Sequence, residues 1–367
     1  MRVVLISLLC LFLCCIQSGC SSKITSSTIK NISDSNEQLS VRLMCTNIET
    51  VSTQVKEKEE SNKFFKSTES HPNDQGKSCR IKYHKLYNTN RYMVVEGKIG
   101  SKGNRYPVVL DTGASQPIFL NVTHVSDNKL PVFPLTNNNA DLNGYNLGLC
   151  YLSSLELGDM LLTNRQCFYL KPRETANLFG VSIAGSSGGD AVILGLPMLR
   201  EFNYVVFDNI WKEAEFSYNK SFSPDETGIW DKYPISIEED FHNNVFLFIE
   251  ICIAGEPTEL QVDTGSGRGL AVSETLWTNI SRNIPNIELK ESKDYYPYIG
   301  RLDCRRGVIP KLQFGNRSLW DAQVSVFPDD SPLVSESEGL IGMKYFEDTV
   351  IALDFERSLM WVRNSGI

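Results

Sequence analysis

Two copies of the tripeptide Asp-Thr-Gly lie 152 residues apart in this chain, at Asp111–Gly113 and Asp263–Gly265. A lone copy is most often only a turn after a strand, because Asp and Gly both suit turns. Here each copy follows two short apolar runs separated by a Gly-containing turn, which predicts a β-hairpin that leads into a loop. The runs are Tyr92–Ile99 and Tyr106–Leu110 in the first copy, and Val245–Ile253 and Thr258–Val262 in the second.

Two further landmarks follow each copy in the same order. The first is an alternating run that breaks at a two-residue turn signal, at Leu155–Asp159 and again at Leu312–Asn316. The second is a short apolar run next to glycine, at Val192–Gly195 and again at Gly339–Gly342. From the acid to the last glycine the distance is 84 residues in the first copy and 79 in the second. Matching order and spacing indicate an internal duplication of about 130 residues.

The duplicated apolar-apolar-Asp-Thr-Gly, followed in each copy by apolar-apolar-Gly, resembles the pepsin and retropepsin group of aspartic proteases. The resemblance covers roughly residues 87–362, about three quarters of the chain. It implies an all-β, bilobal pepsin-like fold in which two duplicated β-barrel-like lobes enclose the active site. We expect lobe 1 at 86–218, a linker at 219–235 with Pro224, Gly228 and Pro234, and lobe 2 at 236–367. Both lobes in one chain imply a monomer.

The resemblance also implies a catalytic pair, Asp111 and Asp263, that hydrolyses a peptide or protein substrate. Two carboxylates pressed together cannot both ionise, so one site holds an acid and a base; the aspartic-protease dyad is itself the standard example of this effect. The base takes a proton from a water while the acid hydrogen-bonds the scissile carbonyl, and neither a metal nor a cofactor is required. Sequence alone does not assign the two roles, because the protons are coupled.

Five neighbouring residues are expected to support the two loops. The resemblance implies that the threonine hydroxyls brace the loops against each other, that the glycines allow close approach of the backbone, and that a hydroxyl three places after the second acid tunes its outer oxygen. These residues are Thr112, Gly113, Thr264, Gly265 and Ser266. Ala114 departs from the pepsin pattern and is similar to the retroviral one. We therefore expect activity closer to neutral pH, and a pH–rate profile that peaks well below pH 5 would contradict this.

A glycine-bearing stretch between the first acid loop and Leu155 is placed where the family has a mobile β-hairpin flap over the cleft. The candidate flap residues are Gly144, Tyr145 and Gly148, and the alternative is a plain surface loop. The equivalent stretch of lobe 2 carries Tyr295, Tyr296 and Tyr298, which line a peptide cleft or pack within it.

The first 19 residues read as a secretory signal peptide, with one basic residue before an apolar run. Ser18 and Gly19 precede Cys20 in a pattern similar to a bacterial lipobox, which predicts lipidation of Cys20 and anchoring to the cell envelope. Gln17 departs from that pattern, and five Asn-X-Ser/Thr sequons favour secretion by a eukaryotic cell instead. Residues 20–85 are polar and are expected to form a tether or a prosegment.

Ten cysteines are present, and six remain after the signal peptide and Cys20 are set aside. In an oxidising compartment an even number allows disulfides. If Gly158-Asp159 is a two-residue turn, Cys150 and Cys167 lie opposite each other and form the first candidate pair. Two further candidate pairs are Cys252 with Cys304 and Cys45 with Cys79.

Other function classes lack their signals. A net charge of −8 argues against nucleic acid as a partner, since phosphates require a basic face. The four histidines have no metal-ligand spacing, and no nucleophile elbow or phosphate-binding loop is present. Two rivals to an aspartic endopeptidase stay open: a peptide-binding protein that kept the fold and lost the reaction, and a self-processing factor that cuts within residues 21–85.

Overall fold

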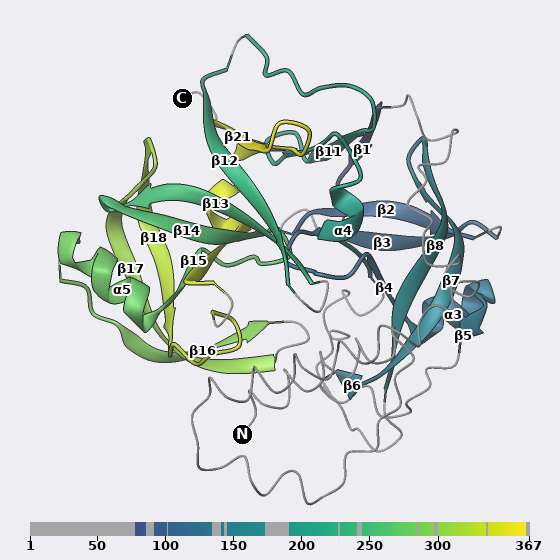
Figure 1. The fold of residues 1–367 in the computed structure, drawn as a ribbon, viewed down its shortest axis with the longest axis horizontal. Coiled ribbons are helices and arrows are strands. Elements are labelled where there is room, and N and C mark those ends of the chain that lie inside the picture. Colours follow the sequence, from purple (N-terminus) through teal and green to yellow (C-terminus); the bar gives the residue numbers. More distant parts are fainter. Residues whose placement is uncertain are drawn as a thin grey trace, which may run out of the picture.

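The computed structural model describes residues 78–85, 92–100, 102–133, 141–142, 145–172, 191–226, 228–240, 244–284, 286–296, 300–334 and 337–364. These residues are mostly β-strand, and the strands divide between two lobes and one sheet that joins them. In Figure 1 lobe 2 lies on the left in green to yellow, lobe 1 lies on the right in blue to teal, and the joining sheet lies above both. The predicted all-β, bilobal fold is confirmed.

Lobe 1 contains a barrel of six strands. Its strands pair in the order β2-β3-β9-β4-β8-β7, and a pairing between β7 and β2 closes the ring. They are β2 (Val94–Ile99), β3 (Asn104–Asp111), β9 (Val192–Gly195), β4 (Ile118–Asn121), β8 (Met160–Pro172) and β7 (Tyr145–Leu157). The short strands β5 (Val132–Phe133) and β6 (Asp141–Leu142) both pair with β7. Closure removes the exposed edges that an open sheet would present.

Lobe 2 repeats this barrel strand for strand. The order is β13-β14-β19-β15-β18-β17, and β17 closes the ring through the pair Ile253 and Phe314. The strands are β13 (Val245–Ile253), β14 (Glu256–Asp263), β19 (Gly339–Gly342), β15 (Leu270–Ser273), β18 (Arg317–Phe327) and β17 (Gly300–Phe314), with β16 (Lys290–Tyr296) paired outside β17. The duplication predicted from the sequence is therefore a duplication of the same six-strand ring.

A six-stranded sheet, here called the interlobe sheet, joins the two barrels. Its order is β1-β11-β10-β20-β21-β12, and the central antiparallel pair β10–β20 brings one strand from each lobe together. The strands are β1 (Ser78–Lys82), β11 (Glu213–Ser217), β10 (Tyr204–Asp208), β20 (Thr349–Asp354), β21 (Leu359–Asn364) and β12 (Trp230–Glu239). The second half of β12 then pairs with β13, so this sheet is continuous with lobe 2.

Short helices fill the corners. Each lobe has one after its barrel strand β4 or β15 and one after β9 or β19. They are α3 (Val122–Asn128) and α4 (Leu196–Leu199) in lobe 1, and α5 (Glu274–Ile280), η4 (Ser281–Asn283) and η5 (Met343–Phe346) in lobe 2. In α3, Asn121 and His124 cap each other's backbone N–H groups, which satisfies donors that a helix start leaves unpaired. No helix of the described residues is long and apolar enough to cross a membrane.

The predicted hairpins and turns agree with the strands. Leu157 pairs with Met160 and Phe314 pairs with Arg317, so Gly158-Asp159 and Gly315-Asn316 are two-residue turns. Both glycines have positive φ, +58° and +56°, a conformation that glycine adopts without steric cost. Local turn chemistry therefore sets the register of the longest hairpins.

Part of the predicted tether or prosegment, residues 20–85, is a β-strand. Residues 78–82 form β1, which pairs with β11 along its whole length in the interlobe sheet. The corresponding strand of lobe 2 is the first half of β12, which begins at Trp230, 152 residues after Ser78 and thus at the spacing of the two acids. The polar character of the preceding segment hid this edge strand, which buries Cys79 and leaves the flanking side chains exposed. The predicted linker, 219–235, overlaps this sheet, because β12 begins at Trp230.

The predicted disulfides are not formed among the described cysteines. Cys150 and Cys167 do lie opposite each other across β7 and β8, as the turn predicts, but both are free, buried thiols. The pairing of Cys252 with Cys304 is wrong, because Cys252 lies beside the Gly315 turn while Cys304 lies near the far end of β17. Cys79 is also a free thiol, and Cys45 lies outside the described residues.

Candidate active site

Each acid lies where a barrel strand ends against a parallel neighbour. Asp111 is the last residue of β3 and pairs with Gly195 of β9, and Asp263 is the last residue of β14 and pairs with Gly342 of β19. Strands β9 and β19 are buried at every position, which explains why their sequences are continuous apolar runs. The second landmark of each repeat is therefore the strand that supports its acid loop. We call Asp111–Gln116 loop 1 and Asp263–Arg268 loop 2.

The two threonines link the loops through four reciprocal hydrogen bonds. The Thr112 hydroxyl donates to the carbonyl of Val262 at 2.6 Å and accepts from the backbone N–H of Thr264 at 3.0 Å. The Thr264 hydroxyl donates to the carbonyl of Leu110 at 2.7 Å and accepts from the backbone N–H of Thr112 at 2.9 Å. Both threonines are fully buried. Hydrogen bonds shielded from water in this way hold the two loops at one separation.

The glycines leave room for the opposite acid. A Cβ atom added to Gly113 would lie 2.5 Å from Oδ1 of Asp263, and one added to Gly265 would collide with the carboxylate of Asp111. Neither glycine has positive φ, so close approach and not backbone conformation requires glycine here. Each carboxylate thus lies over the glycine of the other loop, and the two carboxylates are close enough to interact.

Backbone donors orient both carboxylates in the same way. The N–H of Gly113 donates to Oδ1 of Asp111 at 2.8 Å, and the N–H of Gly265 donates to Oδ1 of Asp263 at 2.9 Å. Such bonds favour the ionised form of a carboxyl group. Each loop therefore supplies its acid with an equivalent fixed donor.

The surroundings raise the pKa values of the two acids to different extents. Burial raises the pKa of Asp263 well above its ordinary value, and the negative charge of Asp111 raises it further. Burial also raises the pKa of Asp111, while the Gly113 N–H and a hydrogen bond from Asp263 act in the opposite direction. The pair titrates as one unit. The pair therefore holds one proton between its two carboxylates at a pH where a free Asp has lost it.

Beyond the acids the two loops differ. Ser115 and Gln116 of loop 1 reach Oδ1 of Asn244 at 3.2 and 3.4 Å, and Asn244 is held by Asp240 at the entry to β13. The hydroxyl of Ser266 in loop 2 accepts from the backbone N–H of Arg268 at 3.3 Å. Asn244 was not among the residues that the sequence singled out, because nothing in its local pattern signals a contact with a loop 128 residues away.

The candidate flap is a hairpin, but only part of it is described. Strand β6 pairs with the start of β7 through Leu142 and Tyr145, which agrees with the predicted hairpin. Gly144 lies outside the described residues, and only the backbone of Tyr145 is described. Gly148 lies opposite Tyr169 on β8, and any Cβ there would collide with the tyrosine ring. Glycine at 148 therefore makes room for an aromatic ring.

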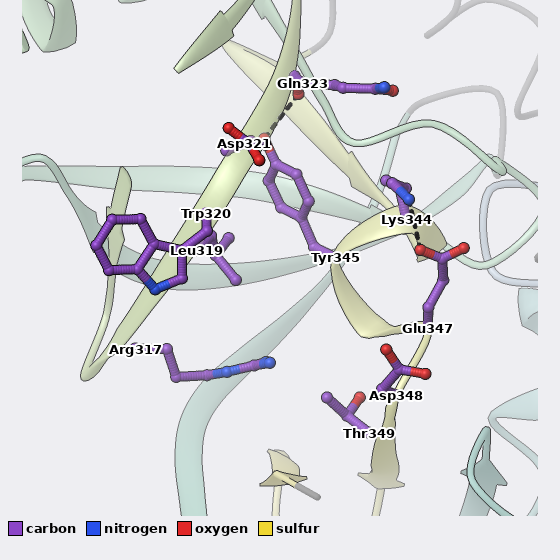
Figure 2. A pocket seen from close by; sticks show the side chains of 11 residues that line it. Arg317, Leu319, Trp320, Asp321, Gln323, Lys344, Tyr345, Glu347, Asp348 and Thr349 are labelled. Carbon is purple, nitrogen blue, oxygen red and sulfur yellow. Dashed lines mark hydrogen bonds and ion pairs between the residues drawn. The ribbon is translucent and has the colours of Figure 1, made fainter. Parts of the chain in front are cut away.

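A pocket of about 260 Å³ lies elsewhere, on lobe 2 between β18 and the segment from η5 to β20. Figure 2 shows Arg317, Tyr345 and Asp348 around it, with Trp320 at one side. Its lining contains neither acid, although the Tyr345 ring also packs against Gly269, the residue after loop 2. This pocket therefore lies apart from the two carboxylates and is not the candidate active site.

Metal and lipid sites are not found in the described part of the chain. No three His, Cys, Asp or Glu side chains gather there in an arrangement that could hold a metal ion. The predicted signal peptide, Cys20 and the polar segment up to residue 77 lie outside the described residues. Lipidation of Cys20 and export therefore stay predictions from the sequence.

No protein-family model matches the chain. No curated protein matches it either. Among solved structures it is similar to the aspartic proteinase from Irpex lacteus, with 12% identity and a TM-score of 0.47, over 78% of this chain and 97% of that one. The fold assignment follows from the strand pairings, and the candidate site follows from its own geometry.

Proposed function

We propose that this protein is an aspartic endopeptidase in which Asp111 and Asp263 activate a water molecule between them. The observation that carries the proposal is the reciprocal threonine bonding, which holds two half-buried carboxylates close together at the junction of the two lobes. Holding like charges together costs stability, so a structure that fixes them there favours a catalytic use.

In the proposed reaction Asp111 is ionised and removes a proton from the water as the water oxygen attacks the scissile carbonyl carbon. Asp263 donates its proton to the carbonyl oxygen, which becomes a hydroxyl of a tetrahedral diol. As the C–N bond breaks, the nitrogen receives the proton that Asp111 took from the water, and Asp263 regains a proton from a diol hydroxyl, so the products are a carboxylic acid and an amine and the dyad is restored. Rigid loops lower the barrier because the donors need no reorganisation.

The second candidate is a peptide-binding protein that has the same cleft and no turnover. It is less favoured, because a binding protein needs neither two acids nor the threonine pairing that holds them in contact. Peptides or proteins are the partners in both cases. We propose a monomer, since both acid loops come from one chain, and an exported protein that Cys20 anchors to a membrane or that is secreted freely.

The test is cleavage of a denatured-protein mixture by the mature chain between pH 3 and pH 8. Asp111→Asn and Asp263→Asn are each expected to lower kcat/KM by about 10,000-fold, because each removes one half of a unit. Asp330→Asn, which changes an exposed acid in the turn after β18, is the matched control. A peptide with a hydroxyl-bearing tetrahedral carbon at the scissile position should inhibit. Binding of that peptide without any cleavage by the wild type would instead favour the binding-protein reading.

A further inference from the structure

Arg268, the last residue of loop 2, takes part in a charged cluster beside the candidate dyad. Its Nη2 atom lies 3.3 Å from Oδ1 of Asp294 on β16, and the same oxygen is paired with Arg306 on β17. The other oxygen, Oδ2, accepts a hydrogen bond from Ser325 on β18 at 2.6 Å. We call these four residues the Asp294 cluster.

The Asp294 cluster lies on the outer face of the lobe 2 barrel wall. Along β18, Val324 and Val326 point into the main core, so Ser325 and Phe327 between and after them point to the opposite face. Asp294 bonds to Ser325, and Tyr296, two residues further along β16, packs edge-on against Phe327. Because Arg268 reaches this face from loop 2, the face borders the acid loops, where a bound peptide would lie.

The cluster carries a surplus of one positive charge. Two guanidinium groups share a single carboxylate, and that carboxylate is completely buried. Arg306 makes the close ion pair and also donates to the carbonyl of Lys293, whereas Arg268 makes the longer contact and keeps 42% of its side chain exposed. An arginine has five N–H donors, so Arg268 retains donors for a second acceptor while Asp294 holds it in place.

Tyr296 connects this face with the dyad. Its side chain is 5% exposed, and its hydroxyl has no hydrogen-bond partner among the described residues. Burial raises the pKa of Tyr296, the negative charge of Asp263 raises it further, and the positive charge of Arg268 opposes this rise. The hydroxyl is therefore close enough to sense both Asp263 and Arg268.

Loop 1 has nothing equivalent. Its residue at the position of Arg268 is the neutral Gln116, 152 residues earlier, and Gln116 is directed to Asn244. Of the two acid loops, both of which the structure describes, only loop 2 carries a positive charge. A peptide that spans both loops would meet a basic group from loop 2 and neutral groups from loop 1.

We propose that Arg268 is a specificity-determining residue that selects peptides with an acidic side chain, Asp or Glu, on the lobe 2 side of the site. The inference rests on the proposed function and names the substrate class for that same site. The exposed guanidinium donates to the substrate carboxylate, and Asp294 and Arg306 hold it in the required orientation. A planar guanidinium suits a carboxylate in two-point geometry.

The experiment uses the mature chain and paired peptides that differ only by Glu or Gln, at each position around the scissile bond in turn. For wild type, kcat/KM should be about tenfold higher for Glu than for Gln at one position. Arg268→Gln should bring that ratio close to one, and Arg268→Lys should keep part of it. The matched control is Arg305→Gln, which removes the neighbouring arginine that pairs with Glu274 at 2.9 Å, and should leave the ratio as in wild type.

Two further measurements keep the outcomes distinct. If Arg268→Gln fails to fold, the salt dependence of the wild type provides the test. Its ratio of kcat/KM for the Glu peptide to that for the Gln peptide should decrease as NaCl is raised from 50 mM to 500 mM, because salt screens a half-exposed charge. Binding of labelled Glu and Gln peptides to Asp111→Asn tests the preference without turnover. Cleavage with no Glu preference, or with one that survives both Arg268→Gln and high salt, overturns the inference and leaves the proposed function intact. If the protein neither cleaves nor binds any of the peptides, both the inference and the proposed function are overturned.

Discussion

Loop 1 and loop 2 are alike for three residues and then diverge. Within Asp-Thr-Gly every contact has a counterpart: a reciprocal threonine bond, a glycine N–H on the acid and a glycine beneath the other acid. Support from the short helix after β9 or β19 also repeats, since the backbone N–H of Leu196 donates to the carbonyl of Ala114 at 2.9 Å and that of Met343 to the carbonyl of Ser266 at 2.8 Å.

After the glycines each loop turns to a different partner. Loop 1 continues to Asn244 through neutral side chains, whereas loop 2 continues to the buried Asp294 through an arginine. The symmetrical part is where two acids must share one proton, and the divergent part is where a substrate with different residues on its two sides would be distinguished. On the proposed function, the symmetrical part serves the reaction and the divergent part serves recognition of the substrate.

The largest effect is expected for Gly113→Ala and Gly265→Ala. Each new methyl group collides with the carboxylate of the opposite acid and displaces it. A displacement near 1 Å costs about 100-fold in rate, so kcat/KM should fall by that factor or more in both variants. Thermal unfolding of each variant checks that the chain still folds. Near-normal activity in one variant alone would show that the two loops do not approach each other equally.

An intermediate effect is expected for Thr112→Val and Thr264→Val. Each substitution keeps the shape and removes one hydroxyl, which leaves a buried carbonyl and a buried N–H without partners. The free energy of unfolding should fall by about 2 kcal/mol, and by the same amount in both variants, as measured by urea denaturation.

Thr278→Val is the matched control for this pair, since the Thr278 hydroxyl makes one exposed bond to the carbonyl of Glu274. It should change the free energy of unfolding by less than about 0.5 kcal/mol. Thr112→Ser and Thr264→Ser should keep most of the stability that the valine variants lose. If the free energy of unfolding falls by different amounts in the two valine variants, the two threonines do not contribute equally to holding the loops together.

The smallest effect is expected in the pH dependence of stability. The folded-state pKa of Asp263 is raised above its unfolded value, so its contribution to stability is full at low pH and is lost as pH rises through the folded pKa. Asp263→Asn removes that loss. In urea denaturation, its free energy of unfolding should exceed that of the wild type by about 1 kcal/mol at pH 7.5 and should differ little at pH 4.

Asp111→Asn should show the same trend with a smaller gain, because the pKa of Asp111 is raised less. This difference tests whether the two acids, alike in their loops, differ in their surroundings. A wild type that becomes more stable relative to both variants as pH rises would falsify the assignment of raised pKa values to the pair.

Features that depend on neighbours in sequence were predictable. The two-residue turn at Gly158-Asp159 placed Cys150 opposite Cys167, because register in a hairpin follows from its turn. The hairpins before each acid followed from apolar runs around a glycine turn. The acids themselves were found because a duplication repeats the local pattern, so that each copy supports the interpretation of the other.

Features that depend on contacts between distant residues were not predictable. Strand β1 looks like part of a polar tether, and its membership in the interlobe sheet follows only from its pairing with β11, more than a hundred residues later. The Asp294 cluster joins four segments, none of which carries a local signal for the others. Gly148 was interpreted as a flap glycine, while the structure gives it a packing role beneath Tyr169.

A duplicated all-β protein with one Asp-Thr-Gly loop in each half could be predicted from the sequence, because strand patterns and turn residues act over a few positions and occur in both halves. Folding brought the carboxylates together, raised the pKa of Asp263 more than that of Asp111, and fixed an arginine in loop 2 but not in loop 1. Those properties arise from burial and from the distance between charges, and both quantities exist only once the two lobes have closed on each other.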